Sequence, residues 1–166
     1  IRLSNNENNR GPGQGALDAA RSAVGVRNGR GYPPDSVNEL TEAIAAMWSV
    51  QRANVIVGTG SGPILEGATR AFTAPDRHLV TVAPTYATCE NMAKRMNVPV
   101  KLITVDSKTM QLDLDAMAAA SKGAGLVYIC NPNNPTGLAH PAALIEQFVR
   151  RVKADSPSTA ILIDEA

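Results

Sequence analysis

The strongest signal in the sequence is Asn131-Pro132-Asn133-Asn134-Pro135-Thr136-Gly137, which directly follows the apolar run Leu126-Val127-Tyr128-Ile129-Cys130. The run is short, β-branched and aromatic, and it stops sharply, as a buried strand does. The seven residues after it cannot continue the strand, because prolines remove ladder donors and asparagine and glycine favour turns. The sequence therefore predicts a stiff loop with amide side chains at the carboxyl end of a strand, where open α/β sheets bind ligands. By composition alone, such clusters are mostly plain turns.

Strands and helices alternate along the rest of the chain. Two helices are predicted near the start, one at 16–26 and one that begins at the capping box of Ser36 and Glu39. The alternation beyond them predicts an α/β fold of three layers, with a mainly parallel sheet, right-handed crossovers and helices on both faces. Apolar runs predict strands at 54–57, 78–82, 100–105, 126–130 and 160–163, and helical spacing predicts helices at 63–72, 114–121 and 142–153 and one that ends near 96.

Some apolar side chains are assigned to packing and not to chemistry. Cys89 and Cys130 lie in apolar surroundings without a C-x-x-C pair, which indicates small buried hydrophobes in a reducing compartment. The helix after Ser36 carries an apolar stripe at helical spacing. We expect the side chains of this stripe to pack in the core: Val37, Leu40, Ile44, Met47 and Trp48.

The composition is that of an ordinary globular protein of 166 residues, with 44% hydrophobic and 19% charged residues. A net charge of +1 and 4% aromatic residues give no support for a nucleic-acid or membrane-surface partner. His78 and His140 have no cysteine or carboxylate at metal-ligand spacing, so we expect no metal site. No apolar run could span a bilayer and no signal peptide is present, so we expect a cytoplasmic protein. The chain starts at Ile1 without methionine, which leaves a removed leader open.

Four unlike groups follow the predicted strands at their carboxyl ends: the turn Gly58-Thr59-Gly60-Ser61-Gly62, Tyr86, Asn134 and Asp164. In a parallel sheet these ends share one edge, so we expect the groups to face one crevice. A glycine turn before a helix offers N–H groups and a helix dipole to a phosphate. An aromatic ring stacks on a flat ligand. An amide can bind a ring hydroxyl, and a carboxylate can pair with a protonated ring nitrogen and make the ring an electron sink. Together the groups fit pyridoxal 5'-phosphate.

The same residues resemble a known family. The chain is similar to the fold-type I pyridoxal-phosphate enzymes of the class I/II aminotransferase family, and within it most similar to the histidinol-phosphate aminotransferase group. The resemblance covers nearly the whole chain. It depends most on the Asn131–Gly137 loop followed by a strand that ends in Asp164-Glu165-Ala166. Its other markers are Ser4-Asn5-Asn6-Glu7-Asn8, Gly31-Tyr32-Pro33, the 58–62 turn and Ala83-Pro84-Thr85-Tyr86.

The resemblance implies a fold, a partner and a role for each marker. The implied enzyme is a pyridoxal-phosphate-dependent aminotransferase, a homodimer that takes a small-molecule amino donor and a 2-oxo acid acceptor. By similarity, the phosphate amides are Gly60, Ser61 and Gly62, Tyr86 stacks on the ring, Asn134 binds the ring oxygen, and Asp164 binds the ring nitrogen. Similarity also implies that Tyr32 reaches the cofactor phosphate of the partner subunit and that Asn6, Glu7 and Asn8 line the substrate entrance.

This sequence also departs from the family pattern. Asn9 stands where the family usually has proline, and Gly62 stands where it often has aspartate. The family's Schiff-base lysine and its carboxylate-binding arginine come after the Asp-Glu-Ala segment, and no residue of this chain matches either. The resemblance therefore implies an N-terminal arm with helices at 1–53 and the first part of the cofactor-binding large domain at 54–166. The chain is then expected to be truncated before the Schiff-base lysine and inactive alone.

Two alternatives stay open. The same half could belong to a pyridoxal-phosphate-dependent decarboxylase, lyase or racemase, because the residues that steer the reaction lie largely outside it. Outside that class, the 58–62 turn could belong to a nucleotide-binding Rossmann-like module, or the chain to a non-catalytic binding module. The Rossmann hypothesis predicts an acidic residue about 20 residues beyond the turn, at the end of the second strand. The sequence has Ala83-Pro84 there instead.

Overall fold

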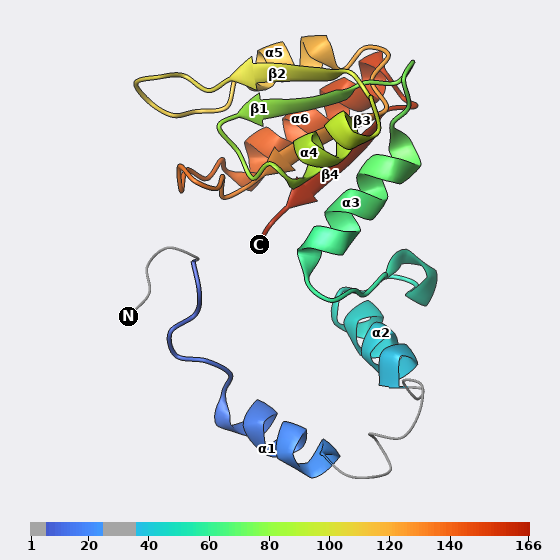
Figure 1. The fold of residues 1–166 in the computed structure, drawn as a ribbon, viewed down its shortest axis with the longest axis vertical. Coiled ribbons are helices and arrows are strands. Elements are labelled where there is room, and N and C mark those ends of the chain that lie inside the picture. The colour runs from blue at the N-terminus through green and yellow to red at the C-terminus, as the bar shows by residue number, and fades with distance from the viewer. Residues whose placement is uncertain (1–5, 25–35) are drawn as a thin grey trace. The chain divides into compact units, whose positions relative to one another are not determined.

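The computed structural model describes residues 6–24 and 36–166, and it divides the chain into two compact units, 1–57 and 58–166 (Figure 1). The second unit contains a parallel sheet of four strands in the order β2-β1-β3-β4. The register sets Leu79 opposite both Val100 and Leu126, and it sets Cys130 opposite Asp164. The strands are β1 (Leu79–Ala83), β2 (Val100–Thr104), β3 (Leu126–Cys130) and β4 (Ala160–Asp164).

Helices cover both faces of this sheet. Side chains of α5 and α6 pack on one face against strand residues such as Val80 and Val127, and side chains of α3 and α4 pack on the other against Leu79 and Tyr128. All five residues of β3 are buried, as expected of a central strand covered twice. The predicted three-layer α/β fold is therefore confirmed. The helices are α3 (Ser61–Phe72), α4 (Thr88–Arg95), α5 (Leu114–Ala120) and α6 (Ala142–Asp155).

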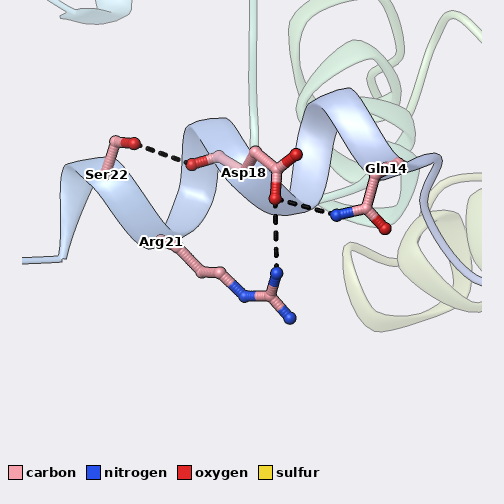
Figure 2. A network of polar contacts seen from close by, with 4 residues as sticks. All are labelled: Gln14, Asp18, Arg21 and Ser22. Atoms are coloured by element: carbon pink, nitrogen blue, oxygen red, sulfur yellow. Dashed lines mark hydrogen bonds and ion pairs between the residues drawn. The ribbon is translucent and has the colours of Figure 1, made fainter.

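The described residues of the first unit form two helices and a short 3-10 helix, namely α1 (Gln14–Ala23), α2 (Ser36–Met47) and η1 (Arg52–Asn54). No residue of α1 is buried. Figure 2 shows the polar contacts along α1. Asp18 Oδ1 accepts hydrogen bonds from Gln14 Nε2 at 2.8 Å and from Arg21 at 3.3 Å. Ser22 Oγ donates to the Asp18 carbonyl at 2.9 Å. Such exposed pairs each stabilise a helix by only a few tenths of a kcal/mol, about 0.3–0.5.

Two predictions for this unit are wrong. The segment 54–57 forms no strand, because after η1 its backbone joins no ladder of the described sheet, and Ile56 is 77% exposed. The stripe on α2 is not core either. Val37, Leu40, Met47 and Trp48 are exposed and Ile44 is half-buried. An apolar face is buried only where a second surface covers it, and the buried side chains among the described residues of α2 are Thr41 and Ala45, not those of the stripe. The side chain of Ser36 lies outside the described residues, so the capping box stays a prediction.

Candidate functional site

The four parallel strands end at one edge of the sheet, and the predicted polar segments follow three of them. The Asn131–Gly137 loop leaves β3, Pro84-Thr85-Tyr86 leaves β1, and Asp164 is the last residue of β4. The arrows of β1, β2 and β4 in Figure 1 point toward the same side, where the chain end labelled C also lies. The peptide bonds that precede Pro84, Pro132 and Pro135 are cis.

Asn133 joins the loops after β1 and β3. Its Oδ1 accepts a hydrogen bond from Thr85 Oγ1 at 2.7 Å, and its Nδ2 donates to the Pro84 carbonyl at 3.1 Å and to Thr136 Oγ1 at 3.0 Å. The side chain is almost completely buried. A buried amide whose donors and acceptor are all used holds its surroundings in one arrangement. Asn133 therefore fixes both loops relative to each other.

Asn131 closes the other end of the loop. Its Oδ1 accepts from the backbone N–H of His140 at 2.7 Å, and its Nδ2 donates to the His140 carbonyl at 3.1 Å. His140 Nε2 in turn accepts the N–H of Leu112 at 3.2 Å. Burial lowers the pKa of His140, which suits a neutral ring that accepts a hydrogen bond. This histidine is thus a structural clamp.

Asn134 follows these two structural asparagines in the loop, but its side chain does not hold the loop together as theirs do. It is half-buried, and within the described part of the chain its side-chain amide has no hydrogen-bond partner. The neighbouring Asn133 holds the backbone in place. An amide that is positioned but unpaired at the edge of the sheet is available to a ligand.

Asp164 is 8% exposed, and each of its carboxylate oxygens already has one donor. Tyr128 Oη donates to Oδ2 at 3.0 Å, and the N–H of Ala166 donates to Oδ1 at 3.2 Å. A carboxylate has about four lone-pair positions, so acceptor capacity remains. Tyr128 is fully buried, and burial first, then the neighbouring Cys130 and Asp164, raises the pKa of its hydroxyl. The hydroxyl therefore stays a donor at neutral pH.

Cys89 connects this carboxylate with α3 and α4. Its Sγ lies 3.8 Å from the Leu65 carbonyl oxygen in the second turn of α3, and Asp164 lies close enough to act on its charge. Burial, as the main cause, raises the pKa of Cys89 to about 11, and burial also raises the pKa of Cys130. Both thiols are free and buried, as predicted from the sequence. Because burial raises both pKa values, the two thiols are poor nucleophiles at neutral pH.

The glycine turn leads directly into α3. Gly60 has φ +87° and ψ 176°, a conformation that is essentially restricted to glycine. No side chain caps the helix, and Ser61 and Gly62 open its first turn with N–H groups that have no acceptor within the helix. A Cβ on Gly62 would meet no atom within 4 Å, so the space above the turn is open. Leu65 follows one turn later, about 6 Å along the axis, which brings this end of α3 near Cys89 and Asp164.

The remaining predicted residues stand as follows. Tyr86 is 41% exposed and lies three residues before Cys89 in the chain. Asn6, Glu7 and Asn8 belong to the first unit, where Asn8 Oδ1 accepts the N–H of Arg10 at 3.0 Å and so shapes its own loop. Tyr32 lies outside the described residues. The structure thus brings together the turn, the Asn-Pro loop and Asp164, and leaves the other markers untested.

Sequence reasoning missed two residues of this edge. It treated Tyr128 as one residue of a buried run and Asn133 as part of a loop. A period-two pattern could have revealed the first, because Tyr128, Cys130 and the end of β4 lie on one face of adjacent strands. For Asn133, no local pattern separates an inward amide from its outward neighbour at 134.

Other features of the described residues do not compete with this edge. A cavity of about 660 Å³ lies between the segments 111–115 and 138–151, and although His140 is part of its lining, none of the predicted site residues lines it. In the described ranges, no group of three or more His, Cys, Asp or Glu side chains could hold a metal ion. No helix in the same ranges has the length and apolar character needed to cross a membrane.

Known proteins resemble the chain throughout its length. It is 34% identical over 167 residues to the histidinol-phosphate aminotransferase of Symbiobacterium thermophilum, a match that covers 100% of this chain and 44% of the relative. It is 35% identical over 170 residues to that of Moorella thermoacetica, covering 100% and 42%. The chain therefore spans less than half the length of these curated relatives.

A solved structure matches the fold. Histidinol-phosphate aminotransferase from Sinorhizobium meliloti, in complex with pyridoxal-5'-phosphate, superimposes with a TM-score of 0.85 at 26% identity, covering 98% of this chain and 43% of the other. The sequence model of the family described as "Aminotransferase class I and II" matches residues 1–166. Since that match includes every residue, the chain belongs to the class I and II aminotransferase family.

Proposed function

We propose that this chain forms the cofactor-holding part of a pyridoxal-phosphate-dependent aminotransferase. The observation that carries the proposal is Asp164, a nearly buried carboxylate with spare acceptor capacity at the carboxyl edge of a parallel sheet. Burying a carboxylate is unfavourable unless it is hydrogen-bonded or paired with positive charge. Two neutral donors orient Asp164 and leave room for a cation, which suits the protonated nitrogen of a pyridine ring.

The open start of α3 supports the phosphate end of the same ligand. The N–H groups of Ser61 and Gly62, together with the helix dipole, form an anion site of the kind that phosphates occupy. Gly60 makes the turn possible through its positive φ, and Gly62 leaves room for the phosphate oxygens. The residues present therefore fit both ends of pyridoxal 5'-phosphate.

The ring would lie between these two ends. We assign the stacking partner of the ring to Tyr86 and the donor to its ring oxygen to Asn134, whose side-chain amide is unpaired among the described residues. When bound, the cofactor supplies an electron sink for negative charge that develops at the substrate Cα. Asp164 holds the proton on the ring nitrogen, and Asn134 orients the ring by its oxygen. These residues bind and orient the cofactor, and the group that moves the Cα proton is not among them.

The proposed substrates are an amino donor and a 2-oxo acid. Both relatives above carry the name histidinol-phosphate aminotransferase, so an amino-alcohol phosphate is the donor class that similarity favours. We place Asn6, Glu7 and Asn8 at the substrate entrance and Tyr32 at the cofactor phosphate of a partner subunit in a homodimer. The division of the chain into an N-terminal arm at 1–53 and a large-domain part at 54–166 belongs to the same proposal.

A titration of the 166-residue chain with pyridoxal 5'-phosphate and, in parallel, with unphosphorylated pyridoxal tests the proposal. Absorbance of the bound ring and equilibrium dialysis report the dissociation constants. We expect saturable binding of the phosphorylated form, at least about tenfold tighter than pyridoxal, because the first turn of α3 contributes only to the former. Equal affinity for both forms would exclude the phosphate site.

Asp164→Asn tests the ring-nitrogen contact. It keeps the shape of the side chain and an acceptor for Tyr128, so we expect an unchanged circular dichroism spectrum. It removes the negative charge, and we expect cofactor affinity to fall about a hundredfold, as for loss of one partner of a buried charge pair. In a longer polypeptide that transaminates, the same change should largely abolish turnover. Near-normal binding and turnover would contradict the assigned role.

The Rossmann-like alternative receives no support from the described residues. It needs a strand that leads into the glycine turn, and residues 54–57 form none. It also needs an acidic residue after the next strand, where β1 runs into Ala83-Pro84.

A further inference from the structure

We propose that Tyr128 is a positioning residue, which aims the carboxylate of Asp164 at the cofactor's ring nitrogen through its buried hydroxyl. The inference depends on the proposed function, because it concerns the same cofactor. Tyr128 itself would touch neither cofactor nor substrate, and its effect would pass entirely through Asp164.

The contact spans two adjacent strands on a diagonal. In the register of β3 and β4, Tyr128 lies opposite Leu162 and Cys130 lies opposite Asp164. The tyrosine therefore reaches its diagonal neighbour, a distance that a long side chain can cover on one face of a sheet. Its hydroxyl donates to Asp164 Oδ2 at 3.0 Å. A short side chain at position 128 could not make this contact.

The geometry fixes the carboxylate at two points. Oδ2 is held by the Tyr128 hydroxyl and Oδ1 by the N–H of Ala166, two residues along the chain. The Ala166 contact comes from the exposed segment that follows β4, whereas Tyr128 is fully buried in the central strand. The more rigid of the two anchors is therefore the tyrosine, because core strands open far less often than chain segments outside the sheet.

The other titratable side chains that face Asp164 are all neutral at pH 7. Among the described residues, those that face it are Tyr128 and Cys130 from β3 and Cys89 from α4, and burial raises the pKa of all three. The nearby residues of α3, Leu65 and Thr69, carry no charge. All these neighbours are neutral at pH 7, so the hydroxyl of Tyr128 donates to an oxygen that no cation within residues 6–24 and 36–166 contacts.

A double-mutant cycle separates positioning from simple packing. The dissociation constant of pyridoxal 5'-phosphate is measured for the wild-type chain, Tyr128→Phe, Asp164→Asn and the double variant, and the series is repeated with the 1-deaza analogue, which lacks the ring nitrogen. We expect Tyr128→Phe to weaken binding of pyridoxal phosphate about tenfold, the loss of one hydrogen bond to a charged group. We expect less than about twofold on the deaza analogue and in the Asp164→Asn background, since non-additivity is the sign of residues that act together.

Thr81→Val is the matched control. Thr81 is in β1, fully buried, and its hydroxyl has no partner among the described residues. The substitution removes a buried hydroxyl and keeps the side-chain shape, as Tyr128→Phe does, but touches no group of the proposed site. We expect unchanged cofactor affinity, and unfolding curves of all variants confirm that each is folded.

The outcomes distinguish this inference from the proposed function. An equal loss for both ligands, an equal loss in both backgrounds, or no loss at all in Tyr128→Phe overturns the positioning role, while a large effect of Asp164→Asn on pyridoxal phosphate leaves the proposed function standing. If the wild-type chain shows no saturable binding, the proposed function falls and the inference falls with it.

Discussion

Residues 58–166 and 1–57 differ in whether the apolar faces that their sequences predict are buried in the structure. In the second unit, strands such as β3 and helices such as α6 bury their apolar faces against each other. In the first unit, α1 buries no residue, and the stripe on α2 is largely exposed. The patterns are equally regular in both. The difference is in how much of each apolar face is covered: both faces of the sheet in 58–166 are packed, whereas the described part of 1–57 buries only Thr41 and Ala45 of α2.

Sequence periodicity therefore predicts a helix or strand and its apolar face, but it does not predict whether that face is buried. The period states which face is apolar, and burial depends on a second surface elsewhere. Where that surface is in the same unit, both the predicted element and its predicted burial are correct. The following predictions measure how far the two units differ, beginning with the largest effect.

The largest effect is expected at Gly125, just before β3. A Cβ there would lie 2.1 Å from the carbonyl oxygen of Phe72, and the backbone is held by its N–H bond to His78 and its carbonyl bond from Ala160. Backbone atoms cannot yield as a flexible side chain can. We expect Gly125→Ala to lower the free energy of unfolding by about 3 kcal/mol or more, measured by urea unfolding followed by circular dichroism.

Gly15→Ala in α1 is the control for that change. A Cβ there would meet no atom within 4 Å, and alanine favours a helix. We expect the main unfolding transition to be unchanged. If Gly15→Ala shifted it as Gly125→Ala does, the two units would unfold as one body and the contrast between them would be wrong.

The strands of the second unit, 58–166, were predicted correctly from the sequence for a physical reason. Strands 78–82, 100–105, 126–130 and 160–163 were each placed within about one residue of β1 to β4, because short apolar runs bounded by proline, glycine or polar residues leave few alternatives. The strand at 54–57 failed although Val55, Ile56 and Val57 have strong strand preference. A strand exists only as a member of a ladder, and no local preference supplies the neighbour.

The second largest effect is expected at Asn133, whose replacement should cost much more stability than replacement of the adjacent Asn134. Asn133→Ala would leave Thr85 Oγ1 and the Pro84 carbonyl without their partner, and it would remove an amide that is itself almost completely buried. We expect a loss of about 2 kcal/mol in the free energy of unfolding, the cost of unsatisfied buried groups. Asn134→Ala should change it by less than about 0.5 kcal/mol.

The same pair distinguishes stability from binding. On the proposed function, Asn134→Ala weakens pyridoxal phosphate binding while the fold is kept. Asn133→Ala acts on both, because it frees the loop that carries Asn134. Equal losses of stability in the two variants would show that the amide of Asn134 is paired in solution, and its assignment to the ring oxygen would then be withdrawn.

The site was less predictable than the fold. Residue type and strand end were enough to select Asp164 and the glycine turn, because parallel topology carries every strand end to one edge. Tyr128 was not selected, since its role depends on the diagonal register between β3 and β4, which becomes known only when the strand order is known. Tyr32 and Asn6–Asn8 were selected by resemblance alone, and no contact within the sheet unit bears on them.

The smallest effect is expected at Ile56, in the segment wrongly predicted as a strand. Ile56 is 77% exposed, so Ile56→Ser removes little buried surface, and we expect the free energy of unfolding to change by less than about 0.5 kcal/mol. Ile129→Val in β3 removes a single methylene from a fully buried position and should cost about 1 kcal/mol. The larger chemical change then has the smaller effect, because burial and not residue type decides the outcome. A loss in Ile56→Ser equal to or above that of Ile129→Val in the same urea series would mean that the side chain of Ile56 is covered in solution, and the contrast between the two units would then be wrong at this position.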